Sequence, residues 1–262
     1  MDPIDEAAAR LRRAEQTRTP CAPVRDLIGA DDVAAAYRVQ SLLIGERMAA
    51  GRTVVGRKIG LTSPAVQQWL GVDTPDFGVL LDDMEYAESE TVPMSRLLQP
   101  RAEAEVAFVL SADLTDGPFT ADSVRGAVGH ARAAIEIVDS RVLDWDIKLG
   151  DTVADNASSG LYVLGSTRLT LDEFEPVDVE MTMTCDGEEV SSGTGAACLG
   201  DPLNALAWLA EAALTYGEPL RAGQVVLSGA LGPVHPVPPG AVVRAEIGPL
   251  GSVTATFSQE TA

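Results

Sequence analysis

The sequence contains few of the residues on which many catalytic triads and zinc sites depend. It has only two histidines, His130 and His235, and neither lies near a serine or cysteine motif, which disfavours a Ser-His or Cys-His triad. Its three cysteines, Cys21, Cys185 and Cys198, are odd in number and widely spaced. They form neither a disulfide framework nor a zinc pattern, so we expect buried thiols.

Long apolar runs, phosphate-binding glycine loops and positive charge are also scarce. No run approaches the roughly 20 apolar residues of a membrane span, and the acidic N-terminus does not resemble a signal peptide, which predicts a cytoplasmic protein. No GxGxxG motif follows a predicted strand, so a nucleotide cofactor is not indicated. With 19 basic against 39 acidic residues and a net charge of −20, the surface suits neither nucleic acid nor an anionic membrane. An anionic substrate would need local positive charge from a metal or from a particular Lys or Arg.

What is present is an ordinary globular composition, with 46% hydrophobic and 22% charged residues. A chain of 262 residues can form one large domain, or one domain with a smaller lobe. A soft boundary near residue 75 divides the chain into an N-terminal α/β part at 1–75 and a continuous core at 76–262.

Hydrophobic periodicity and turn residues predict the elements of this fold. Helices are expected at 4–16, 31–50, 121–140 and 201–217, with a short helix after Ser63. Strands are expected at 53–60, 103–110, 177–185, 188–191, 225–227, 242–247 and 252–257, with a hairpin turn at Asp186-Gly187. Residues 72–78, 79–98 and 144–160 are expected to be irregular, the last as a long polar loop of the kind that often carries function. Many strands with helices set apart favour the α+β class.

Two acidic residues stand at the start of the strand expected at 103–110. Glu103 and Glu105 are two apart, so on a strand their carboxylates point to the same face, where they repel each other. Either this face is solvated, or the pair holds a hard divalent cation through oxygen ligands. Glu136 offers a third carboxylate in an apolar neighbourhood that does not suit an unpartnered acid.

Lys58 and Asp76 are further candidates. Lys58 lies in a glycine-flanked strand, where its side chain either extends from a strand edge or points into a cleft. Near a metal and an anionic substrate it could hold a carboxylate or move a proton. Asp76, within PDFG, is either a turn-forming residue or part of such a site.

An ordered set of motifs resembles the 2-keto-4-pentenoate hydratase family, the hydratase and decarboxylase branch of the fumarylacetoacetate hydrolase superfamily. The motifs are GRKIGLT at 56–62, VQQ at 66–68, LGV at 70–72, PDFG at 75–78, QPRAEAE at 99–105, DTVADNAS at 151–158, LGDPLNA at 199–205, SGALG at 228–232 and GSVTATF at 251–257. The resemblance covers about residues 25–258. It implies a mixed β-roll core with a smaller N-terminal α/β part, assembled as a homo-oligomer.

The resemblance also implies functional residues. Glu103, Glu105 and Glu136 fall on the ligands of Mg²⁺ or Mn²⁺, and Lys58 and Asp76 on the active-site lysine and aspartate. The polar segment at 155–159 matches a substrate-facing segment, with Asp155 and Ser158 as candidate substrate-binding residues.

The implied activity is metal-dependent hydration of 2-hydroxypenta-2,4-dienoate to 4-hydroxy-2-oxopentanoate in the breakdown of aromatic compounds. The alternative is decarboxylation of 2-oxohex-3-enedioate, which uses the same metal chemistry. Hydrolysis of an acylpyruvate is disfavoured because no histidine precedes His130, so the N-terminal lid histidine of such enzymes is missing. A non-catalytic partner subunit is disfavoured because all three acids are present, although association with neighbouring pathway enzymes remains open.

Overall fold

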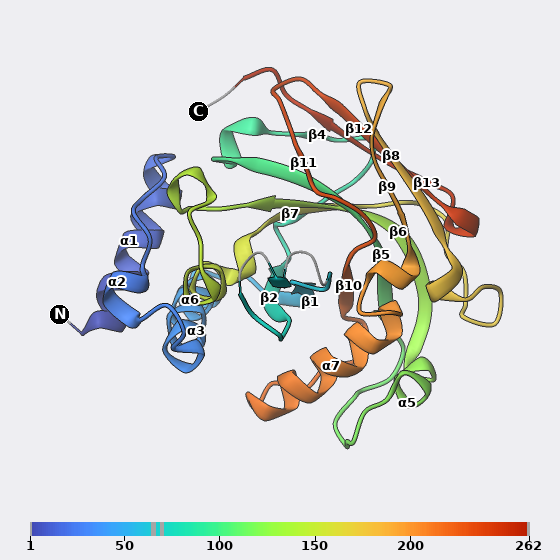
Figure 1. Cartoon of the computed structure of the whole chain (residues 1–262), viewed down its shortest axis with the longest axis horizontal. Coiled ribbons are helices and arrows are strands. Elements are labelled where there is room, and N and C mark those ends of the chain that lie inside the picture. Colours follow the sequence, from blue (N-terminus) through green and yellow to red (C-terminus); the bar gives the residue numbers. More distant parts are fainter. Residues whose placement is uncertain (1, 64–66, 69–70, 261–262) are drawn as a thin grey trace.

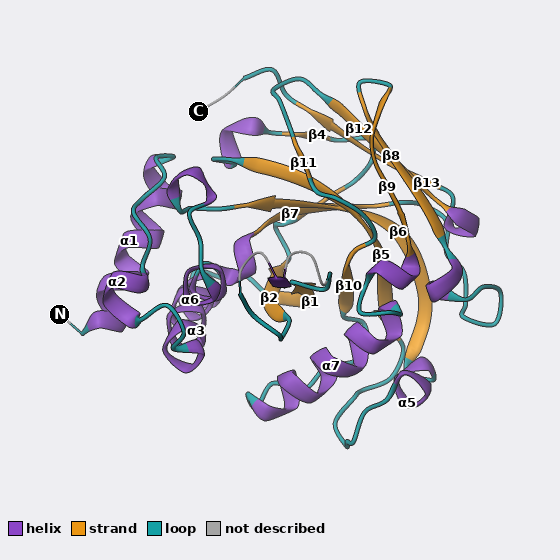
Figure 2. Cartoon of the chain, viewed as in Figure 1, coloured by secondary structure: helices purple, strands orange, loops and turns teal. Residues whose placement is uncertain are grey.

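The computed structural model describes residues 2–63, 67–68 and 71–260 (Figure 1). Its strands form two sheets, and Figure 2 shows most of the helices outside them. The larger sheet has the order β2-β1-β10-β5-β6-β7-β3, with β11 paired to β5, and the smaller one has the order β4-β13-β12-β8-β9. Helices and strands together confirm the α+β class. None of the described helices is long and apolar enough to cross a membrane.

The helices are α1 (Pro3–Thr17), α2 (Arg25–Ile28), α3 (Val33–Ala49), α5 (Ala121–Arg125), α6 (Leu149–Ala154) and α7 (Pro202–Thr215). The strands of the larger sheet are β1 (Val54–Gly60), β2 (Asp76–Leu81), β3 (Glu85–Tyr86), β5 (Pro100–Leu110), β6 (Val128–Asp139), β7 (Ser159–Leu164), β10 (Val225–Ala230) and β11 (His235–Pro236). Those of the smaller sheet are β4 (Thr91–Val92), β8 (Glu180–Cys185), β9 (Glu188–Thr194), β12 (Val242–Ile247) and β13 (Ser252–Phe257). Short 3-10 turns are η1 (Met94–Arg96), η2 (Leu143–Trp145), η3 (Asn156–Ser158), η4 (Pro176–Asp178), η5 (Gly195–Ala197) and η6 (Gly248–Leu250).

Several predicted elements are confirmed where local signals were strong. Helix α7 begins as its sequence indicates, with the Asp201 side chain accepting a hydrogen bond from the Leu203 N–H at 2.8 Å and Pro202 in the first turn. The β8–β9 hairpin turns at Asp186 and Gly187, whose φ angles of 53° and 89° suit its tight turn. The predicted helices at 4–16 and 31–50 and the strands β1, β10, β12 and β13 are also present. The predicted helix after Ser63 lies largely outside the described residues.

The prediction of a helix at 121–140 is wrong. Only Ala121–Arg125 is helical, and Val128–Asp139 forms strand β6, so His130 and Glu136 lie on a strand. Residues 133–139 of β6 are all buried, because the strand is covered on both faces. Such a strand lacks the polar-apolar alternation that marks a half-exposed one, and its apolar run can be mistaken for a buried helix.

The predicted irregular segments also contain regular structure. Asp76 begins β2 instead of lying in a turn, and residues 79–98 include the rest of β2, β3, β4 and η1. The segment at 144–160 contains α6 and η3 rather than one long loop. Of the cysteines, Cys185 and Cys198 are buried as expected, whereas Cys21 is half-buried; all three are free thiols.

Two pairs of neighbouring strands position the site residues. Strands β5 and β6 run antiparallel, and their register places Glu103 directly opposite Glu136. Strand β1 lies between β2, to which it is antiparallel, and β10, to which it is parallel. The division near residue 75 stays a prediction; β1, on its N-terminal side, is hydrogen-bonded within the same sheet as the acidic strands.

Candidate metal centre and active site

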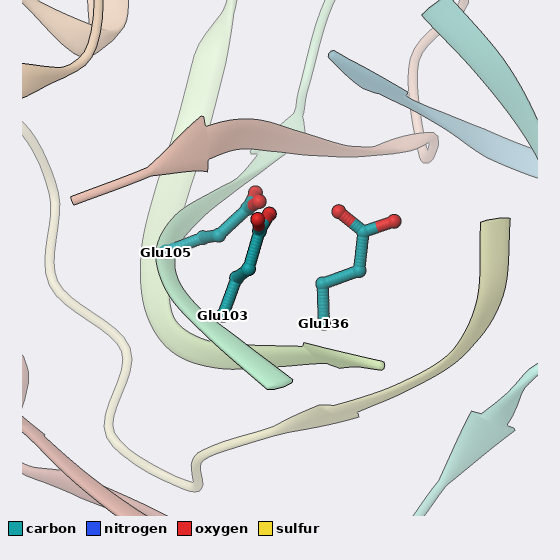
Figure 3. A group of neighbouring side chains, drawn as sticks. All are labelled: Glu103, Glu105 and Glu136. Atoms are coloured by element: carbon teal, nitrogen blue, oxygen red, sulfur yellow. The ribbon is translucent and has the colours of Figure 1, made fainter. Parts of the chain in front are cut away.

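Three glutamates from β5 and β6 converge on one point. Glu103 and Glu105 project from the same face of β5, and Glu136 reaches the same space from the neighbouring strand (Figure 3). One carboxylate oxygen from each residue lies within 4.8 Å of the others. The structure therefore brings together the three acids that the sequence singled out, and the alternative of a solvated strand face is wrong for Glu105, which is 0% exposed.

Two of the three carboxylates, those of Glu105 and Glu136, are fully buried, Glu103 is half-buried, and several of the buried oxygens lack hydrogen-bond donors. Glu105 and Glu136 are 0% and 1% exposed. Glu105 Oε2 accepts the Gly229 N–H at 2.8 Å, but Oε1 of Glu105 and both oxygens of Glu136 have no hydrogen-bond partner among the described residues. Unsatisfied buried carboxylate oxygens are costly, and a hard cation with oxygen ligands would satisfy them. The donor set thus fits a divalent metal ion.

Burial and mutual repulsion also disfavour the charged forms of these acids. Burial and the neighbouring Glu136 raise the pKa of Glu103 to about 7. Burial, followed by the charges of Glu136 and Glu103, raises the pKa of Glu105 well above its ordinary value. A cation placed among the three carboxylates would oppose these shifts.

Lys58 of β1 points toward this centre. Its side chain is 3% exposed, and its Nζ forms an ion pair with Glu136 Oε1 at 3.0 Å. Burial alone would lower the pKa of Lys58, but the surrounding carboxylates, led by Glu136 and Asp76, raise it above its ordinary value. The prediction of a strand-edge lysine in solvent is therefore wrong, and the prediction of a lysine aimed inward is confirmed.

Asp76 lies beside Lys58 at the start of the antiparallel strand β2. It is 1% exposed, and burial raises its pKa to about 6, an effect that the Lys58 charge opposes. The Thr152 hydroxyl donates to Oδ2 at 3.4 Å, while Oδ1 has no hydrogen-bond partner in the described chain. A Cβ on Gly60 would lie 2.3 Å from Oδ1, so only glycine at that position leaves room for the carboxylate.

These groups border a cavity of about 690 Å³. Lys58, Asp76 and Glu103 line one part of it, and the rest combines polar and apolar side chains. The other lining residues include Ile59, Leu61, Thr62, Arg101, Val138, Trp145, Ile147, Thr152, Ala157, Ser158, Ser192, Thr194, Ala197, Leu231, Pro233 and Val234. The arrangement provides an acidic triad that could hold a metal ion, a buried ammonium group and a buried acid beside a cavity large enough for a small organic acid.

The two residues expected to bind substrate have different surroundings. Ser158 lines the cavity, and its hydroxyl lies 3.3 Å from that of Thr152. The Asp155 carboxylate instead pairs with Arg141, accepting hydrogen bonds from the Arg141 Nε–H at 2.5 Å and from the Arg141 backbone N–H at 2.9 Å. Asp155 lines a second, smaller cavity. Burial raises the pKa of Asp155 to about 6, against the opposing charge of Arg141.

Sequence reasoning did not single out most of the lining residues, among them Arg101, Trp145 and Thr152. Arg101 precedes Glu103 by two residues on the same strand, so the period-two argument used for the acids could have found it. The sequence gives no comparable signal for Trp145 or Thr152, which lie in the segment expected to be a loop.

Comparison with known proteins places this site in a family. A family model described as fumarylacetoacetate (FAA) hydrolase C-terminal matches residues 60–258. The chain belongs to the fumarylacetoacetate hydrolase family. The matched range includes the three glutamates and Asp76, and the fold expected from the resemblance is confirmed.

Two relatives and one solved structure cover almost the whole chain. A 2-keto-4-pentenoate hydratase of Paraburkholderia phymatum is 51% identical over 256 residues, which are 98% of each chain. A 2-hydroxyhexa-2,4-dienoate hydratase of Comamonas testosteroni is 38% identical over 98% of each chain. The structure of 4-oxalocrotonate decarboxylase from Pseudomonas putida G7, complexed with magnesium and adipate, superposes with a TM-score of 0.93 at 32% identity, covering 97% of each chain. The expected resemblance to the hydratase and decarboxylase branch is thereby confirmed.

Proposed function

We propose that this protein is a metal-dependent hydro-lyase that converts 2-hydroxypenta-2,4-dienoate (2-oxopent-4-enoate) into 4-hydroxy-2-oxopentanoate in the breakdown of aromatic compounds. The observation that carries the proposal is 51% identity across 98% of the chain to a 2-keto-4-pentenoate hydratase, in a protein that retains a complete acidic triad. Glu103, Glu105 and Glu136 would hold Mg²⁺ or Mn²⁺, since both ions accept oxygen ligands. Such an ion would supply Lewis-acid polarisation at the 2-oxygen of the substrate.

The reaction requires two proton movements and one water. In the first step the dienol loses its O–H proton and gains a proton at C5, which gives the 2-oxo-3-enoate. In the second, the oxygen of water bonds to C4 while the water loses one proton, and a proton is added at C3. A positioned acid-base group is needed in each step.

Lys58 and Asp76 are the groups to which we assign these proton movements. Asp76 presents a partnerless oxygen beside the cavity, while its second oxygen is oriented by the Thr152 hydroxyl at 3.4 Å. That geometry suits an acid that orients water and exchanges a proton with it. Lys58 keeps its ammonium group between Glu136 and the cavity, where it can donate a proton and offset substrate charge.

Ser158 completes the polar wall, and we assign it to substrate binding. Asp155, which the sequence also suggested, is better suited to holding the turn that carries Ser158, because its carboxylate is used by Arg141. We also propose a homo-oligomer, which measurement of the molar mass in solution would test; a monomer at micromolar concentration would contradict it.

Decarboxylation of 2-oxohex-3-enedioate is the second candidate. The observation that favours it is the superposition on 4-oxalocrotonate decarboxylase with a TM-score of 0.93. The identity to that protein, 32%, is lower than the 51% to the hydratase, which is why we rank hydration first.

An absorbance assay tests the proposal. Purified protein is mixed with freshly generated 2-hydroxypenta-2,4-dienoate, and loss of the dienol absorbance is followed with Mg²⁺, with Mn²⁺ and with chelator. We expect metal-dependent loss that yields 4-hydroxy-2-oxopentanoate, slowed about 10²- to 10⁴-fold in Asp76→Asn and Lys58→Met. Glu189→Gln, an exposed residue of β9, is the matched control and should retain full activity. Persistence of the dienol with both metals, together with CO₂ release from 2-oxohex-3-enedioate, would favour the decarboxylase.

A further inference from the structure

Arg101 is a cationic side chain of the cavity that forms no ion pair with the described acids, although the charge of Glu103, two residues along β5, acts on it. The basic residues lining the cavity in the described part of the chain are Lys58 and Arg101. Lys58 is held by Glu136 at 3.0 Å, whereas no hydrogen bond or ion pair joins the Arg101 side chain to any described residue. In a protein with a net charge of −20, a half-buried guanidinium group whose hydrogen-bond donors are not taken by a described acid is available for an anionic ligand.

The protein nevertheless fixes this guanidinium group in place. Its central carbon lies 4.5 Å from the centre of the Trp145 ring, a cation–π contact. The indole Nε1–H donates to the Gln99 carbonyl at 3.1 Å, and the Gln99 side chain accepts the Asp144 N–H at 2.7 Å and donates to the Val142 carbonyl at 2.7 Å.

The backbone under the indole is also constrained. Asp144 and Trp145 have φ angles of 57° and 56°, in the left-handed region that non-glycine residues adopt at some cost. The hydrogen bonds of Gln99 thus stabilise a strained turn, and this turn carries the Trp145 ring that contacts the Arg101 guanidinium group. Strain kept in one place by specific hydrogen bonds is a common property of ligand-binding sites.

Arg101 lies close to the carboxylate triad along β5 and lines the same cavity as Glu103. Arg101 and Glu103 are two residues apart on β5, so their Cα atoms are separated by roughly 6.6 Å on the same face of the strand. A ligand group near Glu103 is therefore within reach of the long Arg101 side chain. A planar guanidinium group also matches a carboxylate, which it can bind through two parallel hydrogen bonds.

We propose that Arg101, supported by Trp145 and Gln99, binds the carboxylate of the 2-oxo acid substrate and is the residue that makes the enzyme specific for acids over their neutral analogues. The inference rests on the proposed function for the substrate class. It assigns to Arg101 a task that Lys58 cannot perform alone, because the Lys58 ammonium group is already paired with Glu136. Three carboxylates at the metal centre would otherwise repel an anionic substrate.

The test compares an acid with its neutral amide. The dissociation constants of 2-oxopentanoate and 2-oxopentanamide are measured by calorimetry on the Mg²⁺-loaded full-length protein and on Arg101→Gln. We expect the variant to bind the acid about 10- to 100-fold more weakly and the amide within about twofold of the parent protein, because only the acid loses a charged hydrogen-bonded pair. Arg101→Lys, which keeps the charge but not the two-pronged geometry, should recover part of the affinity for the acid.

Further variants separate binding from folding. Arg244→Gln, an exposed residue of β12, should leave both constants unchanged, and Trp145→Leu should weaken acid binding less than Arg101→Gln does. Mg²⁺ affinity and the melting temperature of Arg101→Gln should stay close to those of the parent protein, because the Arg101 side chain is neither a metal ligand nor a hydrogen-bond donor to the described residues.

Three results would overturn the inference. Equal weakening of acid and amide, unchanged binding of both, or weakening only for a dicarboxylate such as hexanedioate would each exclude Arg101 as the anchor of the substrate carboxylate. These outcomes are distinct from failure of the proposed function. If the parent protein does not hydrate the dienoate yet distinguishes the acid from the amide through Arg101, the hydratase assignment fails while the carboxylate site stands.

Discussion

Two cavities of this protein differ in whether their charged residues are paired with one another. The smaller one, of about 130 Å³, lies between α1, α3 and the larger sheet, and most of its charged residues form ion pairs: Arg12 with Glu46, Arg141 with Asp155, and Arg47 with Glu15 and with the nearby Asp83. Arg18 and Asp139 hydrogen-bond to backbone groups instead. The larger cavity and the adjoining metal centre contain the opposite arrangement. There, one oxygen each of Asp76 and Glu105 and both oxygens of Glu136 lack hydrogen-bond donors, and Arg101 forms no ion pair with the described acids, although Lys58 does pair with Glu136.

This difference separates structural charges from functional ones. A buried charge that is paired within the protein depends on its partner. When one partner is removed, the other becomes an uncompensated buried charge, which lowers the stability of the fold. A buried charge without a partner costs stability and is retained where a ligand completes it. We therefore expect substitutions at the metal centre to reduce activity, and substitutions in the paired cavity to reduce stability.

The largest expected effect follows from removing one unpaired charge at the metal centre. Glu105→Gln should abolish measurable Mg²⁺ binding at millimolar concentration and lower hydratase activity about 10³-fold or more, because one of three anionic ligands becomes neutral. The metal-free variant should be at least as stable as the parent protein, since the charged form of Glu105 is disfavoured by burial. Calorimetry, the absorbance assay and urea unfolding measure the three quantities. A clear loss of stability without loss of metal binding would mean that Glu105 is a structural residue.

Breaking a pair in the smaller cavity should have the opposite outcome. Arg141→Met leaves the Asp155 carboxylate buried without its cation, at a cost of about 3–5 kcal/mol in the free energy of unfolding. Mg²⁺ binding by the folded protein should persist. The double variant Arg141→Met/Asp155→Asn should recover part of the lost stability, because no uncompensated charge remains. If the double variant is no more stable than the single one, the loss comes from the other Arg141 hydrogen bonds and not from the broken pair.

A smaller effect is expected from pH on the metal-free protein. The pKa of Glu103 in the folded protein is about 7, above its ordinary value of 4.5, and that of Glu105 is also raised. A raised carboxyl pKa stabilises the fold below pH 4.5, and this contribution is lost as pH rises toward 7 and the buried groups ionise. Mg²⁺ should offset the loss; at 100 times its dissociation constant a ligand adds about 2.7 kcal/mol.

Melting temperatures with chelator and with Mg²⁺ at pH 6 and pH 8 measure this effect. The increase caused by Mg²⁺ should be larger at pH 8, and the same pair of measurements on Glu105→Gln should show little increase at either pH. An increase in the parent protein that is equal at both pH values would show that the acids are already ionised at pH 6.

The metal centre was accessible to sequence reasoning because its main signal is local. Glu103 and Glu105 are two residues apart on a strand that the pattern identified, and a strand alone is enough to place both acids on one face. Glu136 was selected for its apolar neighbours, although it was assigned to a helix. Its real position opposite Glu103 depends on the register between β5 and β6, which is set by pairing of distant segments.

Other parts of the site depend on contacts that no local pattern encodes. Asp76 looks like a turn residue because of its PDFG context, yet pairing with β1 makes it the first residue of β2. The segment at 144–160 is rich in small and polar residues, which favours a loop, but α6 and a left-handed turn form there. That turn is stabilised by hydrogen bonds to β2, about 77 residues away in the sequence.

The left-handed turn provides the prediction with the smallest effect. Asn156, Ala157 and Ser158 have φ angles of 54°, 53° and 52°, and the Asn156 side chain accepts the Val79 N–H at 2.8 Å and donates to the Val79 carbonyl at 2.9 Å. Asn156→Ala and Asn156→Gly both remove these bonds, but glycine tolerates a positive φ without strain. We therefore expect the glycine variant to be about 1 kcal/mol more stable than the alanine variant in urea unfolding.

A control substitution in a helix should change the free energy of unfolding in the opposite direction. In the right-handed helix α1, Ala9→Gly should lower the free energy of unfolding by about 1 kcal/mol, so glycine is the worse residue there. If alanine is also the better residue at position 156, the backbone of the turn relaxes once the amide is removed. The turn would then be held by Asn156 alone, and the place of Ser158 at the cavity would depend on that one side chain, because the backbone itself would not retain the left-handed conformation.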